Sequence, residues 1–222
     1  MVLIRKYQPS DRNEVIKICW RTGYMGEDAK GRFDDPYLFG LLFCIYYLDY
    51  EPDNCYVAID EKSEVIIGYI LSSFDSKKQG KRFRRLMSLK IFRRAFFSTM
   101  WRRPKTFKTF LYFRKIEKKT PSIPNEKELL SPYPAHLHID ILPKWHRMGI
   151  GTRLVHTLES HFSSNGVSGV HLGTTDYNVK AVPFYSKLGF SLIYEGPSGY
   201  GMWPDAPEAK PLIFAKKIKS EI

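Results

Sequence analysis

The stretch HIDILPKWHRMGIGTRL, residues 138–154, decides the fold of this chain. An apolar strand pattern ends at Pro143, two glycines follow within one short turn, and a helical pattern of apolar residues begins near Gly151. The first main-chain N–H groups of a helix lack internal acceptors and carry the positive end of the helix dipole. Such a strand, turn and helix can bind a diphosphate through the main chain, provided that glycine lets the ligand approach.

The same turn also fits an ordinary connection between a strand and a helix. It has neither the GxGxxG pattern of dinucleotide-binding folds nor the GK[ST] sequence of a P-loop. A second segment, LGTTDYNVKAVPFYSKLGF at 172–190, adds context, because it places Asn178 after the next predicted strand and Tyr185 in the next predicted helix. Taken alone, Phe184 and Tyr185 also fit the core side of an amphipathic helix.

Together the two segments resemble the GNAT N-acetyltransferase superfamily, whose acyl-CoA loop reads Arg or Gln, two residues, Gly, any residue, then Gly or Ala. The string here is HRMGIG, so His146 stands where Arg or Gln is usual. The resemblance extends to residues 4–22, 65–70 and 172–190, and it leaves out only a basic insertion. It implies an α/β fold with a mixed, mostly antiparallel central sheet flanked by helices.

The resemblance also implies that acetyl-CoA is the co-substrate, that an amine is the acceptor and that no metal takes part. Asn178 is expected to contact the pantetheine arm, and the Tyr185 phenol to lie beside the thioester sulfur and protonate the departing thiolate. The other coenzyme contacts are expected at Ile141, Leu142, Arg147, Met148, Gly149, Ile150, Gly151 and Thr152. More narrowly, residues 22–40 and 134–143 are similar to the acetyltransferase-like domain of O-GlcNAc hydrolases.

The fourth predicted strand carries a polar titratable residue at every second position, His136, His138 and Asp140. The two-residue period of a strand places them on one face of the sheet. A base is needed there, because a primary amine with a pKa of about 10.4 is almost wholly protonated at neutral pH. The glutamate that several GNAT enzymes place on this strand falls on Ala135, so His138 and Asp140 are the candidate bases, followed by Asp176 and Asp28. A buried, purely structural cluster is the alternative.

Hydrophobic periods predict seven strands and several helices along the chain. One of the helices is expected to run without a break over residues 36–48. The strands are expected at 2–7, 55–59, 65–72, 135–142, 169–174, 190–195 and 211–218.

Residues 76–119 hold 17 Lys and Arg side chains and one acid, Glu117, whereas the rest of the chain has 18 basic and 22 acidic residues. The net charge of +12 therefore belongs to one segment. Its apolar residues recur at steps of two to five, which predicts one or two amphipathic helices broken near Pro104. With a proline-rich return loop, the segment forms a basic helical insertion at 76–131, between the third and fourth strands.

Four uses of this insertion are open. Its apolar side can pack on the domain with the arginines solvated, or the segment can bind an anionic membrane surface, nucleic acid, or the phosphates of coenzyme A and an acidic acceptor. Two classes of function follow. One is an acetyl-CoA-dependent N-acetyltransferase, and the other is a catalytically degenerate GNAT-fold module that uses the insertion to bind a membrane or nucleic acid.

With 222 residues, 43% of them hydrophobic, the chain has enough apolar mass for a single folded domain over residues 1–222. Its longest apolar stretch, 37–48, is shorter than the about 20 residues that span a bilayer. No signal peptide is expected, and three scattered cysteines indicate neither a disulfide framework nor a metal site. We therefore expect a cytoplasmic protein, as a monomer or a homodimer.

Overall fold

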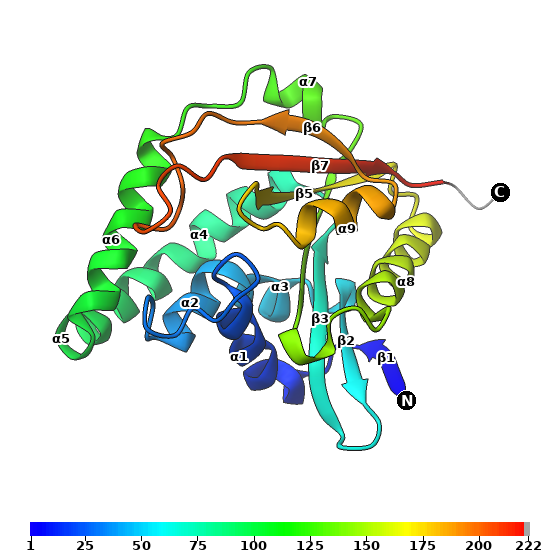
Figure 1. The fold of residues 1–222 in the computed structure, drawn as a ribbon, viewed down its shortest axis with the longest axis horizontal. Coiled ribbons are helices and arrows are strands. Elements are labelled where there is room, and N and C mark those ends of the chain that lie inside the picture. Colours follow the sequence, from blue (N-terminus) through cyan, green and yellow to red (C-terminus); the bar gives the residue numbers. More distant parts are fainter. Residues whose placement is uncertain (220–222) are drawn as a thin grey trace.

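A computed structural model describes residues 1–219, and its seven strands form one sheet (Figure 1). The strand order is β1-β2-β3-β4-β5-β7-β6, and every neighbouring pair is antiparallel except β4 and β5, which are parallel. The mixed, mostly antiparallel sheet expected from the sequence is therefore confirmed. The strands are β1 Val2–Lys6, β2 Cys55–Asp60, β3 Val65–Ser73, β4 Ala135–Ile141, β5 Gly169–Thr175, β6 Ser191–Glu195 and β7 Pro211–Lys217.

Helices cover both faces of the sheet, and each face buries an apolar cluster. Strand β3 contributes to both clusters and is buried along all but its first residue, which explains its nearly unbroken apolar sequence. On one face lie α1 Arg12–Thr22, α2 Pro36–Phe43 and α3 Ile45–Tyr50, and on the other lie α8 Ile150–Ser164 and α9 Ala181–Lys187.

The helix expected over residues 36–48 is wrong as one element, because the structure has two helices, α2 and α3, with a break at Cys44. The Asp35 carboxylate begins α2 by accepting a hydrogen bond from Leu38 N–H at 3.1 Å. Cys44 has a φ of −129°, outside the helical region, so the chain changes direction there and buries residues 45–48. No glycine or proline marks this position, so the sequence carries no signal for the break.

The basic insertion is a pair of helical arms between β3 and β4 (Figure 1). The first arm is α4, Ser76–Arg94, which continues through a π-helical turn at Ala95–Thr99 into α5, Met100–Arg102. The second arm is α6, Pro104–Lys119, and the break before Pro104 is the one that the sequence predicts. The return loop holds one further short helix, α7 Glu126–Leu130.

Part of the apolar side of each arm packs against the domain. Met87 and Ile91 of α4 and Phe113 of α6 are buried in the same cluster as the residues of α1, α2 and α3. Of the 17 basic residues between 76 and 119, all but Arg94 and Arg103 are exposed. The packed arrangement with solvated arginines is thus present in the structure. Within residues 1–219, we find no helix that is both long enough and apolar enough to cross a membrane.

A buried ion pair joins the insertion to the start of α2. The fully buried Asp35 carboxylate accepts from Arg94 Nε and Nη2 at 3.0 and 2.9 Å, and from the Thr99 hydroxyl at 2.5 Å. Burial raises the pKa of Asp35, but the hydrogen bonds from Arg94 and Thr99 outweigh it and hold the pKa below its ordinary value. At the start of α6, the Thr106 hydroxyl accepts from Asp34 N–H at 2.7 Å. Both arms are therefore tied to residues 34 and 35.

We expect Asp35→Ala to lower the free energy of unfolding by about 3 kcal/mol, because it leaves Arg94 and Thr99 without their buried acceptor. Asp34→Ala is the matched control, since that side chain is exposed, and a change within about 0.5 kcal/mol is expected. Urea unfolding followed by circular dichroism measures both. Equal destabilisation by the two substitutions would show that the ion pair does not anchor the insertion.

Candidate active site

The cleft of the molecule forms where β4 and β5 separate. Along the described strands they pair only at Ala135 with Val170 and at His136 with His171. Beyond this point the main-chain groups that face across the gap have no partner strand. A cavity of ≈ 210 Å³ lies in the gap, and its lining includes His138, Asp140, Thr175, Asn178 and Tyr185.

The turn from β4 to α8 leaves its main-chain amides free. Residues 143–145 form a 3₁₀ turn, and His146 Nε2 lies 2.8 Å from the Ile141 carbonyl oxygen, which ties the turn to the end of β4. At the start of α8, Arg153 N–H donates to Gly149 O at 3.1 Å. The amides of residues 147–152 make no hydrogen bond to another residue of the described chain. These N–H groups are therefore available at the positive end of a 15-residue helix.

Two glycines shape this turn for different reasons. Gly149 has a φ of +75° and Arg147 a φ of +62°, and such left-handed residues beside helical ones form concave, anion-binding turns. At Gly151, a β-carbon would lie 2.9 Å from the Phe184 ring and 3.2 Å from Ile141. Gly149 therefore sets the curvature of the turn, whereas Gly151 lets α8 begin close against α9 and β4.

Ile141 and Leu142, expected to contact the coenzyme, have main-chain atoms that are already engaged. Leu142 N–H donates to Ile67 O at 2.9 Å, and the Ile141 carbonyl is bonded to His146. The Leu142 amide is thus not available to a ligand. A coenzyme contact at Ile141 or Leu142 stays a prediction. It would have to use atoms other than the Ile141 carbonyl oxygen and the Leu142 N–H.

Asn178 and Tyr185 lie together on the β5 and α9 side of the cavity. Tyr185 is 7% exposed, and burial together with the charge on Asp140 raises its pKa above that of free tyrosine, so it stays a neutral phenol. Beside it, the Thr175 hydroxyl is buried with no hydrogen-bond partner anywhere in residues 1–219. An orphaned buried hydroxyl in a cleft wall fits a site that a polar ligand completes.

His138 and Asp140 line the cavity from β4, and Tyr69 of β3 completes a hydrogen-bonded group of three residues with them. Asp140 Oδ2 accepts from the Tyr69 hydroxyl at 2.5 Å and lies 3.2 Å from His138 Nε2. Burial lowers the pKa of His138, but the charge and the hydrogen bond of Asp140 outweigh it and raise the pKa to about 9. His138 is therefore protonated at neutral pH. The pair holds one proton that it releases near pH 9.

His136 shares its strand face with His138 but has the opposite electrostatics. Its Nδ1 is joined to the Tyr47 hydroxyl at 2.9 Å. Burial, with the neighbouring His171 and His138, lowers the pKa of His136 to about 3. The predicted polar face is thus divided into a neutral histidine and a charged His138–Asp140 pair.

Three potential metal ligands, Cys19 Sγ, a ring nitrogen of His138 and a carboxylate oxygen of Asp140, lie within 4.8 Å of one another. A cation there would have to displace the His138 proton and ionise Cys19, whose pKa burial raises well above its ordinary value. The arrangement favours a proton-binding group over a metal centre.

The lower-ranked candidate bases lie outside the cavity lining. The Asp28 carboxylate accepts from Lys30 N–H at 2.8 Å on the surface, and the Asp176 carboxylate accepts from Lys210 N–H at 2.8 Å.

Sequence reasoning missed Tyr69, because its partner Asp140 is set by the register between β3 and β4. A lone tyrosine inside the aliphatic run of β3 was the available signal.

The comparisons with known proteins agree with this geometry. Residues 122–190, from the return loop to the residue before β6, match the acetyltransferase (GNAT) family. The solved structure of SsHAT is similar at 27% identity over 99% of each chain, with a TM-score of 0.72. Naa20 of Chaetomium thermophilum, in complex with a bisubstrate analogue, is similar at 20% identity over 97% of this chain and 86% of that one, with a TM-score of 0.54.

A third solved structure, the ribosomal-protein-S18-alanine N-acetyltransferase from Escherichia coli, is similar at 15% identity over 100% of this chain and 96% of that one, with a TM-score of 0.55. The narrower resemblance to O-GlcNAc hydrolase domains is not among these findings and stays a prediction.

The charge state of His138 can be measured directly. In the folded protein, NMR titration of its ring protons should give an apparent pKa of about 9, and Asp140→Asn should bring that pKa below 7, because the attraction is lost while the burial remains. Because the folded pKa lies above the unfolded one, the pair stabilises the fold below about pH 6.5 and loses this effect as the pH rises through 9. A wild-type value below 7 would contradict the assignment.

Proposed function

We propose that this chain, which carries an acetyltransferase domain of the GNAT superfamily, moves an acetyl group from acetyl-CoA to a primary amine by direct attack in a ternary complex. The observation that carries the proposal is the set of free main-chain amides at residues 147–152, which directly follows the strand lining the open cleft. Phosphate groups are among the anions that such a helix start binds.

The cleft residues fit the rest of the coenzyme. Acetyl-CoA supplies the acetyl group as an activated thioester. With its diphosphate on the turn, Asn178 and the orphaned Thr175 hydroxyl offer polar contacts between β4 and β5, and Tyr185 lies farther along the same wall. The unpaired main-chain groups of β4 and β5 are further partners for the amide groups of the pantetheine arm.

The His138–Asp140 pair takes the proton from the amine in this proposal. A free amine is disfavoured at neutral pH by about 4 to 5 kcal/mol, given its pKa of about 10.4. Because His138 is protonated at neutral pH, it must first lose its own proton. Only this deprotonated form, whose share grows as the pH rises toward 9, can accept the proton of the amine, directly or through water. His136, with a pKa of about 3, is too weak a base for this role.

Tyr185 provides the proton that the leaving group needs. As the amine nitrogen bonds to the acetyl carbon, the carbon–sulfur bond breaks, and the phenol donates its proton to the thiolate. The ammonium nitrogen gives up two protons in all: the His138–Asp140 pair takes the first and passes it to solvent, and the second, lost as the amide forms, returns to Tyr185. Ammonium and thioester thus become amide, thiol and one released proton. The raised pKa of Tyr185 keeps the phenol protonated before the reaction.

The competing class is the catalytically degenerate module, and the exposed basic residues of the insertion are the observation that favours it. The two classes differ in what they require of acetyl-CoA, because only a transferase must bind it and release the thiol. A cytoplasmic location is part of the proposal and is supported by three buried, unpaired cysteines. Whether the protein is a monomer or a homodimer stays a prediction.

Tyr185→Phe tests the proposed chemistry. We expect it to lower kcat by about 10²-fold, with the KM for acetyl-CoA changed less than about twofold, because only a transition-state proton is lost. Tyr177→Phe is the matched control, since Tyr177 is 47% exposed and lies outside the cavity. Release of the CoA thiol, followed with a thiol reagent over a panel of primary amines, measures both.

Full turnover in Tyr185→Phe would remove its role as proton donor. If no amine causes thiol release and the protein does not bind acetyl-CoA, the transferase proposal is wrong and the catalytically degenerate module is the remaining function class.

A further inference from the structure

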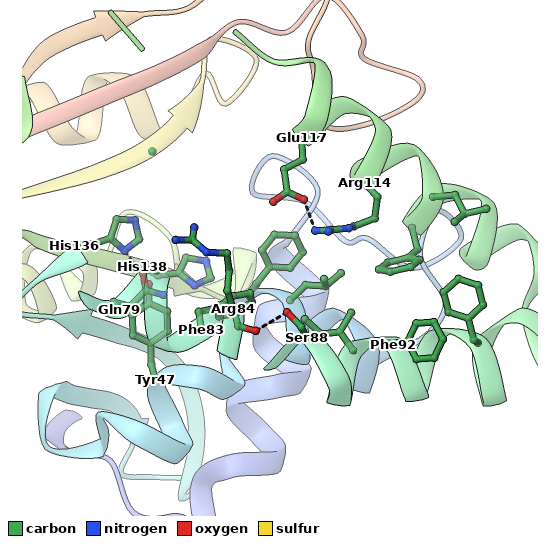
Figure 2. Close-up of a pocket in the computed structure, with 18 residues that line it drawn as sticks. Tyr47, Gln79, Phe83, Arg84, Ser88, Phe92, Arg114, Glu117, His136 and His138 are labelled. Atoms are coloured by element: carbon green, nitrogen blue, oxygen red, sulfur yellow. Dashed lines mark hydrogen bonds and ion pairs between the residues drawn. The ribbon is translucent and has the colours of Figure 1, made fainter. Parts of the chain in front are cut away.

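A second and larger cavity, of ≈ 900 Å³, lies between the insertion and the sheet (Figure 2). It meets the cleft at three shared residues, Phe43, His138 and Gly173. Its described lining includes no residue of the 147–152 turn, α8 or α9, so it lies away from the coenzyme contacts. A molecule in this cavity would therefore reach the His138–Asp140 pair from the side opposite to the diphosphate turn.

The insertion supplies most of the cavity wall, and much of that wall is apolar. Its side chains come from both arms, so they would enclose a bound molecule between α4 and α6. They include Phe83, Ile91, Phe92, Phe96, Phe110 and Leu111. A volume of this size is typical of sites for small organic ligands, which occupy roughly 300–1,000 Å³.

The charges of the cavity are unbalanced. Arg114 is paired with Glu117 of the same helix, and Glu117 is the one carboxylate in the described lining. Arg84 extends from α4 toward His136 and His138 and has no acidic partner within residues 1–219 (Figure 2). The end of the cavity nearest His138 therefore carries a guanidinium that no carboxylate of the described residues neutralises. An anion is the group that a free guanidinium binds most strongly.

We propose that this cavity holds the acceptor, and that the acceptor is a primary amine on an apolar body with an anionic group, a carboxylate or a phosphate, that pairs with Arg84. The amine group of this acceptor follows from the proposed function, on which this inference rests. Its apolar body and its anionic group follow from the cavity lining. The anionic group binds at Arg84 while the amine reaches the His138–Asp140 pair. Polycationic amines such as spermidine are disfavoured, because no unpaired acid in the described lining receives them.

Binding of three probe amines tests this inference without turnover. The probes 4-(2-aminoethyl)benzoate and 4-(2-aminoethyl)benzamide differ in the anionic group alone, and spermidine carries extra positive charge. In NMR titrations, the benzoate should bind about 10-fold more tightly than the benzamide, and spermidine more weakly than both. Arg84→Gln should abolish the preference for the benzoate. Arg85→Gln, on the same helix but outside the cavity lining, should preserve it.

Equal binding of the benzoate and the benzamide, tighter binding of spermidine, or a preference retained in Arg84→Gln would overturn the inference. A hexapeptide with an N-terminal Phe and internal Glu residues distinguishes the source of the amine, since Arg84-dependent binding of the peptide points to a protein terminus. Because no thiol release is read, this inference and the proposed transferase activity can fail separately.

A separate observation concerns the outer end of the insertion, residues 92–105, which we call the apex. Phe97 and Trp101 are 75% and 76% exposed there, and α5 is the part of the insertion farthest from the sheet (Figure 1). Exposed Arg93, Arg102 and Lys105 accompany them, with no acidic partner in the part of the chain that the structure describes. Aromatic side chains beside unpaired cations fit the interface of an anionic bilayer.

We infer that the apex docks on an anionic membrane surface, with Phe97 and Trp101 among the lipid headgroups and the cations at the lipid phosphates. Protruding aromatic side chains favour a lipid surface over nucleic acid, which the same charges would otherwise suit. Vesicle sedimentation should show binding to phosphatidylcholine with about 30% phosphatidylserine and little binding to phosphatidylcholine alone.

The double variant Phe97→Ser with Trp101→Ser should bind the anionic vesicles at least about 10-fold more weakly. Val179→Ser, whose side chain is 73% exposed elsewhere on the surface, is the control and should bind as the wild type does. No binding to anionic vesicles, unchanged binding of the double variant, or tighter binding to duplex DNA than to vesicles would each overturn the inference.

Discussion

The separation of β4 from β5 after His136 is the constraint from which the site follows. Strand β4 remains paired with β3, and β5 with β7, so the sheet is held on both sides while the gap between them stays open. Because the two strands diverge, side chains of both line one cavity. Strand β4 then continues into the turn whose amides are free. An open parallel pair therefore creates both the walls of the cleft and its anion-binding end.

The insertion adds a second wall to this arrangement. Its buried tie, Asp35 with Arg94 and Thr99, fixes α4 against the start of α2, and the apolar sides of α4 and α6 complete the packing. With the arms held in this way, the larger cavity opens onto His138, which also lines the cleft. Packing of the insertion thus determines which molecules can approach the His138–Asp140 pair, and this links the stability of the fold to the choice of acceptor.

Much of this structure is predictable from the sequence, because local patterns carry it. Strand periods, Pro104 and the glycines of the turn fix the order of elements, the break in the insertion and the start of α8. The break at Cys44 has no local signal, since it results from burying residues 45–48. The two-residue period placed His136 and His138 on one face, but their opposite pKa shifts depend on burial and on Asp140 and His171, which only the folded sheet brings near. The large cavity is likewise set by tertiary packing of the insertion.

The central claim is that the main-chain amides of residues 147–152 bind the diphosphate of coenzyme A. Two-dimensional ¹H–¹⁵N NMR spectra recorded while CoA is added measure this directly, because each of these amides gives its own signal. The account predicts that the largest shifts fall on residues 147–152, and that acetyl-pantetheine, which lacks the diphosphate, leaves them nearly unchanged. Saturating CoA with no shift at these amides, or equal shifts with acetyl-pantetheine, would contradict it.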